Sequence, residues 1–469
     1  MLEGVILLAQ VVEEQRVPQS PLFPADRPLF DTVGIHLDLK GVPPTAQRLL
    51  SLLDVFAAAR YNAVLVEWED MFPWTCDPRF RSETAYTPDE VTAFLAKAKQ
   101  LHIEVIPLVQ CLGHMETPLK FPEYAHLREV PDQTSVLNPL APGARQLVQN
   151  MMEDVLALMP DIKYFHLGGD EAWSFGTHPD TKAYIEEHGK GALFLQHIEP
   201  LLDELLARNI RPILWHDMIR TWESPALNKL KEKADICVWG YQKTPDTVDP
   251  ERHFHVSNIE RLHDHNMTLW GGTAYKGGDG GDLDIPNYSR RLENILGWAD
   301  VGTRFSMKGM FVTGWSRYCT MVTQLSPIDS SLDFLVLAST ILHTGKEPET
   351  GLEACVDFLK QIGEYELFAR CRQVINELSQ QKLYAWEHIR LTRENTVCSK
   401  LDPTRCDQMV VQQALDTING YSKNITALMP KVKEAFVGLV PDIWMERYVG
   451  DRLLAIQEEL EDVTKRLAE

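Results

Sequence analysis

The chain has 469 residues, 44% of them hydrophobic, which is enough to bury the core of one large domain with an appended piece. Its 46 basic and 67 acidic side chains give a formal net charge of −21, which would repel nucleic-acid phosphates and anionic lipids. No run approaches the roughly 20 apolar residues that a membrane span needs. We therefore expect neither nucleic acid nor a membrane as a partner.

The N-terminal stretch is rich in proline and charge up to residue 31, and we expect residues 1–31 to form a loosely ordered leader. Its first apolar run has no basic residue ahead of it and no small-residue cleavage site, both of which a secretory signal needs. The 8 cysteines show no spacing typical of zinc, and only Cys398 and Cys406 are close enough in sequence to consider as a pair. We expect reduced thiols and an intracellular location, cytoplasmic and also possible in the nucleus.

Eight strand-like apolar runs follow the leader, at residues 33–39, 63–68, 103–109, 162–167, 212–215, 236–239, 267–270 and 309–314. Helical patterns lie between them, among others at residues 45–60, 88–101, 144–159, 193–208, 285–299 and 332–343. This alternation predicts an α/β fold, a (β/α)8 TIM barrel over residues 32–345. A doubly wound sheet is the alternative, but the segment after the first strand is not a glycine-rich phosphate loop.

The strand pattern stops near residue 346, and residues 346–469 are predicted to form a C-terminal α-helical region. Its helical patterns cover residues 364–394, 408–419, 425–436 and 447–469. The last one has a narrow apolar stripe made of Leu453, Ile456, Leu460, Val463 and Leu467. We expect this stripe to dock on neighbouring helices, and a homodimer contact is the alternative.

The stretch at residues 162–173 is the most informative part of the chain. An apolar run of β-branched and aromatic residues breaks at Gly168-Gly169 and is followed by Asp170 and Glu171. Adjacent side chains of an extended segment point apart, so these carboxylates cannot face each other across one glycosidic bond. We expect one of them to be a proton donor and the other to orient a part of the substrate.

The ends of the other predicted strands carry polar and aromatic side chains, where a barrel holds its chemistry. In chain order the strand ends offer Asp38; Glu69 and Asp70; Gln110 and His114; Asp170 and Glu171; Trp215 and Asp217; Trp239 and Tyr241; Trp270 and Tyr275; and Trp315 and Arg317. Indole faces stack on the C–H faces of sugars, while carboxylates and arginine bind hydroxyls. This lining suits a pyranose.

The sequence His166-Leu167-Gly168-Gly169-Asp170-Glu171 resembles the His-x-Gly-Gly-Asp-Glu motif of the family-20 glycoside hydrolases, the β-N-acetylhexosaminidases. Segments at 35–41, 69–73, 112–116 and 313–318 look like the hexosaminidase D branch of that family, and the resemblance covers roughly residues 33–345, with a weaker similarity near 442–456. It implies removal of terminal non-reducing β-linked N-acetylhexosamine, GalNAc or GlcNAc or both, from glycans. The implied chemistry is retaining and needs no cofactor, because the substrate's own acetamido oxygen attacks the anomeric carbon.

The resemblance also implies roles for single residues. Glu171 would be the general acid and base, with its pKa raised by burial or by the neighbouring charge of Asp170, which would hold the acetamido group. The implied wall of the N-acetyl pocket consists of Trp215, Trp239 and Trp315. Tyr241 or Tyr275 would bond the acetamido oxygen, and Tyr241 is preferred because it directly follows a strand. His114 matches a histidine near the pocket.

The chain departs from the family pattern at the outer end of the sugar. Secreted members have an arginine shortly before the aspartate of the first strand, which this chain lacks, and Arg317 stands after the last barrel tryptophan in place of a glutamate. Asp38, Glu69, Asp70 and Arg317 are the candidates to hold the outer hydroxyls. The preference between GlcNAc and GalNAc, which differ at the C4 hydroxyl, therefore stays open.

Two other functions are weighed. A metal-dependent barrel hydrolase could use His36, His114, His166, His216 or Asp217 as ligands, but the first strand reads His36-Leu37-Asp38 and not His-x-His, so we expect no metal. A non-catalytic carbohydrate-binding barrel would keep the aromatic residues but would not need both Asp170 and Glu171.

Overall fold

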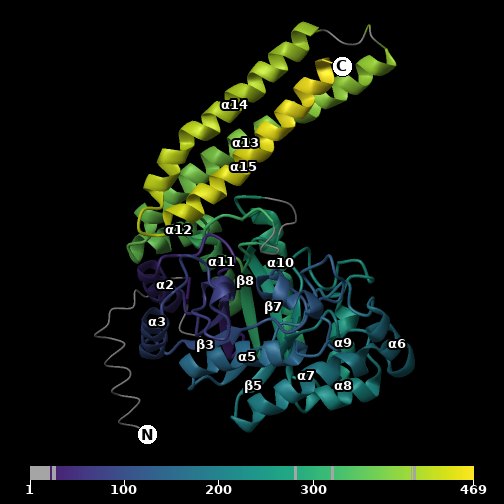
Figure 1. Ribbon diagram of the computed structural model, residues 1–469. Helices are drawn as coiled ribbons and strands as arrows, with labels where there is room; N and C mark the ends of the chain where they lie inside the picture. Colours follow the sequence, from purple (N-terminus) through teal and green to yellow (C-terminus); the bar gives the residue numbers. More distant parts are fainter. Residues whose placement is uncertain are drawn as a thin grey trace.

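The computed structural model describes residues 22–23, 28–278, 283–317, 322–402, 404 and 408–468. Eight parallel strands close into one barrel in the order β1 to β8, which confirms the predicted TIM barrel (Figure 1). The strands are β1 (Thr32–Asp38), β2 (Ala63–Glu67), β3 (Glu104–Leu108), β4 (Tyr164–His166), β5 (Arg211–Trp215), β6 (Asp235–Trp239), β7 (Leu269–Lys276) and β8 (Gly309–Gly314).

Helices surround the barrel and follow its strands. They are α2 (Ala46–Ala58), α3 (Pro88–Gln100), α4 (Glu116–Leu119), α5 (Ala144–Leu158), α6 (Pro179–His188), α7 (Lys190–Ala207), α8 (Ser224–Lys231), α9 (Val256–Asp264), α10 (Tyr288–Arg304) and α11 (Leu332–Thr344). Threonine caps begin the first two of them: Thr45 accepts from the backbone of Arg48, and Thr87 forms a capping box with Glu90. The helices thus begin on the same side as the strand ends, where the loops carry the predicted site residues.

The barrel has two hydrophobic layers. The interior is filled by Ala63, Leu65, Ile106, Leu108, Ile213, Trp215, Cys237, Trp270 and Phe311, with Tyr164, Trp239 and Trp315 partly buried against them. The other face of each strand packs on the surrounding helices, as period-two alternation in a parallel strand requires. Residues at the carboxyl end of this interior therefore form the floor of any site at the barrel mouth.

Strand β7 differs most from its prediction, because it begins at Leu269 and continues to Lys276. Trp270 lies at the start of the strand, where its ring stacks on Phe311 and its Nε1 donates to Asp235, the first residue of β6. The expectation that Trp270 ends a strand at the mouth is therefore wrong. Gly271 and Gly272 resemble a turn in the sequence, but they lie inside the strand, where a Cβ on Gly271 would come 2.5 Å from the sulfur of Met310.

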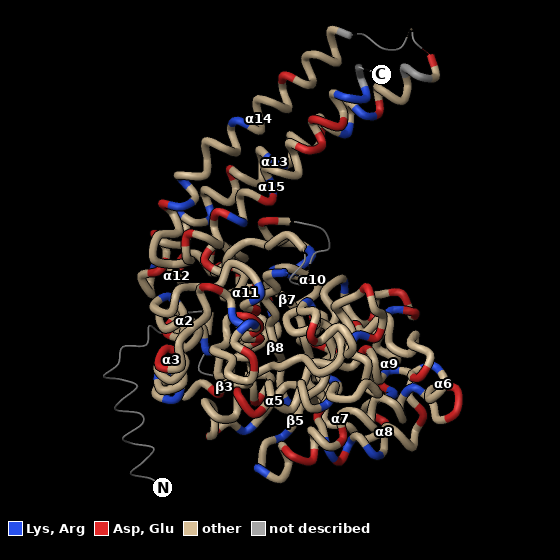
Figure 2. Tube along the Cα trace, viewed as in Figure 1, with Lys and Arg blue, Asp and Glu red and all other residues tan. Residues whose placement is uncertain are grey.

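The C-terminal region is helical, as predicted, and consists of α12 (Leu352–Gln361), α13 (Tyr365–Leu401), α14 (Gln408–Ala435) and α15 (Asp442–Ala468). The two helices expected at 408–419 and 425–436 are one continuous helix, and α12 was not predicted. Gly420 does not interrupt α14, because packing on α13 and α15 outweighs its low helix propensity. The three long helices project from the barrel as an arm, along which acidic and basic side chains are interspersed (Figures 1 and 2).

The apolar stripe of α15 faces its neighbours. Ile456 and Val463 are buried, Leu453 and Leu460 are partly buried, and α15 packs against α13 and α14. The side chain of Leu467 lies outside the described residues. The docking of the stripe within the chain accounts for these residues, and the homodimer stays a prediction.

Most of the expected leader lies outside the described residues, but Leu22, Phe23 and Phe30 are buried. The ring of Phe23 packs edge-on against His343 and Phe358. This part of the segment packs on the fold, contrary to a loose leader. In the described part of the chain no helix is both long and apolar enough to span a bilayer.

The cysteines that the structure places among the strands and helices, Cys76, Cys111, Cys237, Cys355 and Cys371, form no disulfide. Of the considered pair, Cys398 lies in α13, and Cys406 lies outside the described residues. The reducing compartment stays a prediction.

Candidate active site

The glycines after β4 shape the loop that carries the two acids. Gly168 and Gly169 have φ values of +59° and +84°, a region that favours glycine. A Cβ on Gly168 would lie 1.9 Å from the amide oxygen of Gln110, and one on Gly169 would lie 3.1 Å from the ring of Phe194. Both the turn and the space therefore require glycine before Asp170.

Asp170 and Glu171 share one imidazole. The Nε2 atom of His114 lies 3.5 Å from Oδ2 of Asp170 and 3.3 Å from Oε2 of Glu171. Asp170 is buried, while the side chain of Glu171 is 17% exposed. The Oδ1 atom of Asp170 is buried and accepts no hydrogen bond from the described residues. A buried carboxylate oxygen without a donor is costly, which indicates that a ligand supplies the donor.

The loop after β3 brings His114 to these acids. Gly113 packs so closely that a Cβ there would lie 1.9 Å from the carbonyl oxygen of Asp170. Burial alone would lower the pKa of His114, but the charge of Asp170 and the hydrogen bonds to Asp170 and Glu171 outweigh it and raise the pKa well above its ordinary value. The contacts with Asp170 and Glu171 therefore favour the protonated form of His114.

Asp217 joins the acids to the aromatic residues. Its Oδ2 accepts from the backbone N–H of Glu171 at 2.9 Å, and its Oδ1 accepts from Nε1 of Trp239 at 3.2 Å. Burial, followed by the charge of Asp170, raises the pKa of Asp217 to about 7. Asp217 thus fixes the left-handed backbone of Glu171, whose φ is +48°.

Three tryptophans and one tyrosine lie at the carboxyl ends of β5, β6 and β8, and Asp217 links one of them, Trp239, to the backbone of Glu171. Trp215 is buried, and Trp239 and Trp315 pack partly exposed on the same interior layer. The ring of Tyr241 stacks on Trp239 with centroids 5.2 Å apart and meets Trp315 at 6.1 Å. We call these four residues the aromatic wall.

Tyr275 is not part of the aromatic wall. It lies within β7 and its ring packs in the outer layer, where a Cβ on Gly314 would come 2.4 Å from it. It lies near Tyr61, whose hydroxyl donates to the carbonyl of Leu335 in α11. The structure brings Tyr241, and not Tyr275, to the tryptophans. The expectation of a loop position for Tyr275 is wrong because β7 is longer than predicted.

A buried ion network occupies the mouth on the side of β1 and β2. Nζ of Lys40 lies 2.7 Å from Oε1 of Glu67, and Nε2 of Gln110 donates to the same oxygen at 3.1 Å. Burial would raise the pKa of Glu67, but Lys40 and His36 outweigh it and lower the pKa. The sequence analysis did not select Lys40 or Glu67. The sequence feature that could have identified them is a charged residue within or next to an apolar strand.

Asp38 faces the backbone of the loop after β8. Its Oδ2 accepts from the N–H groups of Ser316 at 2.7 Å and Arg317 at 3.2 Å, and its Oδ1 accepts from the N–H of Lys40 at 3.0 Å. The contacts in the structure thus make Asp38 a support for the loop that follows Trp315. A role toward substrate stays a prediction.

Glu69, Asp70 and Arg317 lie next to this network. Oε2 of Glu69 accepts from the hydroxyl of Thr117 at 2.8 Å, and burial raises the pKa of Glu69 to about 8 despite the charge of Lys40. Burial raises the pKa of Asp70 to about 6 against the attraction of Lys120 and Arg317. Glu69 and Asp70 are therefore carboxyls that titrate near neutral pH.

His253 is a further residue that the sequence analysis missed. Its ring lies 4.2 Å from the ring of Trp239, and its Nδ1 lies 3.3 Å from Nε2 of His216. Burial lowers the pKa of His253 to about 4, so it is a neutral imidazole behind the aromatic wall. It belongs to the loop after β6, where the sequence has no motif to mark it.

The metal ligands considered from the sequence do not converge. His36 lies beside Glu67, and His166 accepts from the N–H of Gly168 through Nδ1. In the described part of the chain, one group has donor atoms close enough for a metal ion, namely His114, Asp170 and Glu171, within 4.8 Å of one another. The group consists of the acid pair and the histidine that contacts it. The same three side chains could therefore act in acid catalysis or ligate a metal ion.

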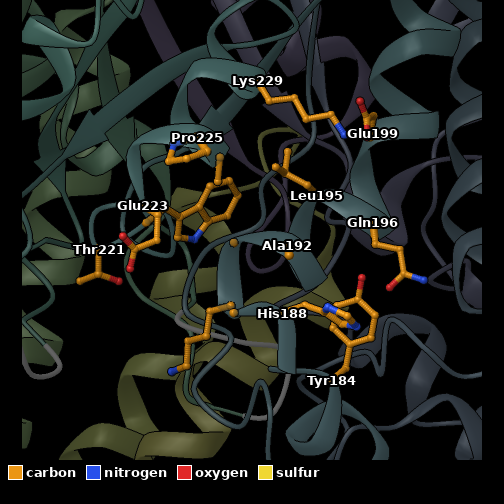
Figure 3. Close-up of a pocket in the computed structure, with 15 residues that line it drawn as sticks. Tyr184, His188, Ala192, Leu195, Gln196, Glu199, Thr221, Glu223, Pro225 and Lys229 are labelled. Atoms are coloured by element: carbon orange, nitrogen blue, oxygen red, sulfur yellow. Dashed lines mark hydrogen bonds and ion pairs between the residues drawn. The ribbon is translucent and has the colours of Figure 1, made fainter. Parts of the chain in front are cut away.

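A cavity of about 830 Å³ lies away from the acids, between α7 and α8 (Figure 3). Trp222, Tyr184 and the ion-paired Lys229 and Glu199 belong to its lining, which includes none of the predicted site residues. A much smaller cavity, about 10 Å³, touches Glu69, Gln110 and His114.

Residues 34–253 match the model of the glycosyl hydrolase family 20 catalytic domain. The chain is 32% identical to bovine hexosaminidase D over 307 residues, which is 63% of this chain and 87% of the relative. It is 34% identical to human hexosaminidase D over 295 residues, which is 61% of this chain and 60% of that protein. The chain belongs to glycosyl hydrolase family 20.

Solved structures of family-20 enzymes share its fold. An exo-β-N-acetylglucosaminidase from Vibrio harveyi superposes with a TM-score of 0.53 at 18% identity, covering 73% of this chain and 59% of that one. A Flavobacterium johnsoniae chitobiase gives 0.54 at 13% identity, covering 94% and 72%. At these identities the likeness shows the barrel alone. Sequence similarity to the hexosaminidases D shows that this family-20 chain is a glycoside hydrolase of the hexosaminidase type.

Proposed function

We propose that this family-20 enzyme removes terminal non-reducing β-linked N-acetylhexosamine, GalNAc or GlcNAc or both, by substrate-assisted retaining catalysis. The observation that carries the proposal is the buried Asp170, which has one oxygen without a donor in the described structure and lies beside Glu171. An acetamido N–H is a donor of the kind that this oxygen lacks. The aromatic wall supplies the apolar surroundings that an acetamido methyl group needs.

In the first step Glu171 gives its proton to the glycosidic oxygen while the acetamido oxygen of the substrate attacks the anomeric carbon. The C–O bond to the leaving alcohol breaks, and a cyclic oxazolinium ion forms. Asp170 accepts the acetamido N–H and stabilises the positive charge that develops there. In the second step Glu171 removes a proton from water, which attacks the anomeric carbon and reopens the ring, so the configuration is retained.

Other residues support this chemistry through position and charge. Asp217 holds the backbone of Glu171, and His114 meets both carboxylates. The hydroxyl of Tyr241 is the proposed donor to the acetamido oxygen, since its ring lies between Trp239 and Trp315. The names of the relatives, hexosaminidase D among them, are consistent with this substrate class.

The test compares chromogenic N-acetyl-β-hexosaminides with matched glycosides that carry a 2-hydroxyl group in place of the acetamide. We expect turnover of the former alone, and strong inhibition by a thiazoline mimic of the oxazolinium ion. Equal rates on both substrates would contradict substrate assistance. Turnover of either substrate would exclude a barrel that only binds sugars.

The metal-dependent hydrolase remains the second candidate, because His114, Asp170 and Glu171 could ligate a cation. A strong chelator separates the two functions. The proposed mechanism predicts unchanged turnover after dialysis against the chelator. Loss of turnover that added metal restores would favour the second candidate.

A further inference from the structure

The C-terminal helix α15 contacts three loops at the barrel mouth. Nε1 of Trp444 donates to the hydroxyl of Thr84, in the segment between β2 and α3, at 2.7 Å. Arg452 forms an ion pair with Asp284, which precedes α10, and donates to the carbonyl of Gln324 after β8 at 2.8 Å. α15 runs from this junction outward along the arm (Figure 1).

These contacts are buried and mutually supporting. Asp284 is buried and also receives the hydroxyl of Tyr448 at 2.6 Å and Nζ of Lys382 at 2.8 Å. The amide oxygen of Gln324 accepts from the N–H of Val42 after β1 at 2.8 Å. The arm is therefore fastened to the same loops that carry the outer-hydroxyl candidates, and not to the far end of the barrel.

Trp444 contacts Arg317, one of those candidates, and the β2–α3 segment that holds another, Asp70. The guanidinium carbon of Arg317 lies 5.6 Å from the centroid of its ring, and Trp444 is buried. Thr84, its hydrogen-bond partner, lies in the same segment between β2 and α3 as Asp70, and the charges of Asp70 and Arg317 attract each other. One oxygen of Asp70 is buried and accepts no hydrogen bond from the described residues. A hydroxyl both donates and accepts, so it can bind this carboxylate and this guanidinium together.

We propose that Trp444 is a positioning residue, which holds the guanidinium of Arg317 beside Asp70 so that the C-terminal region takes part in binding the outer hydroxyls of the sugar. The inference rests on the proposed function. Stacking on a buried ring helps to fix the plane of a guanidinium. Arg317 then acts on substrate binding more than on the chemical step, which belongs to Asp170 and Glu171.

The experiment measures kcat and KM on nitrophenyl β-GlcNAc and β-GalNAc. Trp444→Ala removes the ring next to Arg317, together with its contact to Arg447 and its hydrogen bond to Thr84, and should raise KM about three- to thirtyfold with little change in kcat. Trp444→Phe should restore most of the affinity because it keeps a ring under Arg317. Arg393→Met is the matched control, since it breaks the contacts of Arg393 with Glu459 and Asp462 farther along the arm and should leave KM unchanged.

A double variant decides between positioning and general destabilisation. In an Arg317→Met background, Trp444→Ala should raise KM no further, because the group it holds is gone. Equal effects of Trp444→Ala in both backgrounds, or an unchanged KM, would overturn the inference while leaving the wild-type activity intact. If wild-type enzyme neither turns over these substrates nor binds N-acetylhexosamine in calorimetry, the proposed function itself fails.

Discussion

The two sides of the barrel mouth differ in how their buried carboxyl groups are paired with basic side chains. On the side of β1 and β2, Lys40 meets Glu67 at 2.7 Å and Asp38 at 3.7 Å. On the side of β4 and β5, Asp170, Glu171 and Asp217 stand together, and the ion pairs that the described residues form there all involve His114. One side is stabilised as it stands. In the proposed mechanism, the acids on the other side stabilise a substrate that becomes positive as it reacts.

The largest loss of activity is expected when the proposed proton donor is removed. Glu171→Gln keeps the shape of the side chain but cannot exchange a proton, so turnover should fall about 10²- to 10⁴-fold. Asp170→Ala should also lose most activity, since it removes the partner of the acetamide. Steady-state rates on a chromogenic N-acetyl-β-hexosaminide check both variants.

Glu186→Gln on the surface of α6 is the control for the acid variants, because Glu186 is exposed. It should keep the wild-type rate. A Glu171→Gln enzyme with the wild-type rate would remove Glu171 from the reaction.

On the side of β1 and β2, removing one charged group should lower the stability of the fold. Lys40→Met leaves Glu67 and Asp38 buried beside each other without their cation, which should lower the free energy of unfolding by about 3–5 kcal/mol. Lys163→Met, at an exposed ion pair with Glu104, should cost less than about 1 kcal/mol. Urea unfolding measures both, and equal losses would contradict the claim that the Lys40 network stabilises the fold.

The sequence predicts the side that carries the chemistry better than the side that carries the ion network. Asp170 and Glu171 follow a glycine pair after a buried strand, so local sequence marks them. Lys40 and Glu67 are single charges whose partner lies on another strand, and Trp444 reaches Thr84 across 360 positions. No local pattern reports such pairings, since tertiary contact alone creates them.

The strands follow the same rule. Apolar runs located seven of the eight strands within two residues at each end, because burial on both faces leaves a continuous signal. The exception is β7, where Gly271 and Gly272 have the composition of a turn but serve close packing inside the barrel. That single error moved Trp270 and Tyr275 to the mouth in the prediction.

Asp217 should make the stability of the protein depend on pH. Its pKa is about 7 in the native state and roughly 3.9 in an unfolded chain, so the native state binds the proton more tightly. Its contribution to stability is full below about pH 4 and is lost as the pH rises to about 7. The free energy of unfolding of wild type minus that of Asp217→Asn should therefore fall across this range. A difference that stays constant with pH in urea titrations would show that Asp217 is ionised throughout.

The smallest expected effect is the difference in kcat/KM between variants of Tyr241 and Tyr275. Tyr241→Phe removes a hydroxyl at the aromatic wall and should lower kcat/KM up to about tenfold, the usual value of one hydrogen bond. Tyr275→Phe removes a hydroxyl from the outer layer, where it can change stability but has no route to the sugar. Both variants keep their rings, so packing is matched and the difference reports on the hydroxyl alone. Equal losses of kcat/KM would place Tyr275 in the reaction and contradict the division between barrel mouth and outer layer.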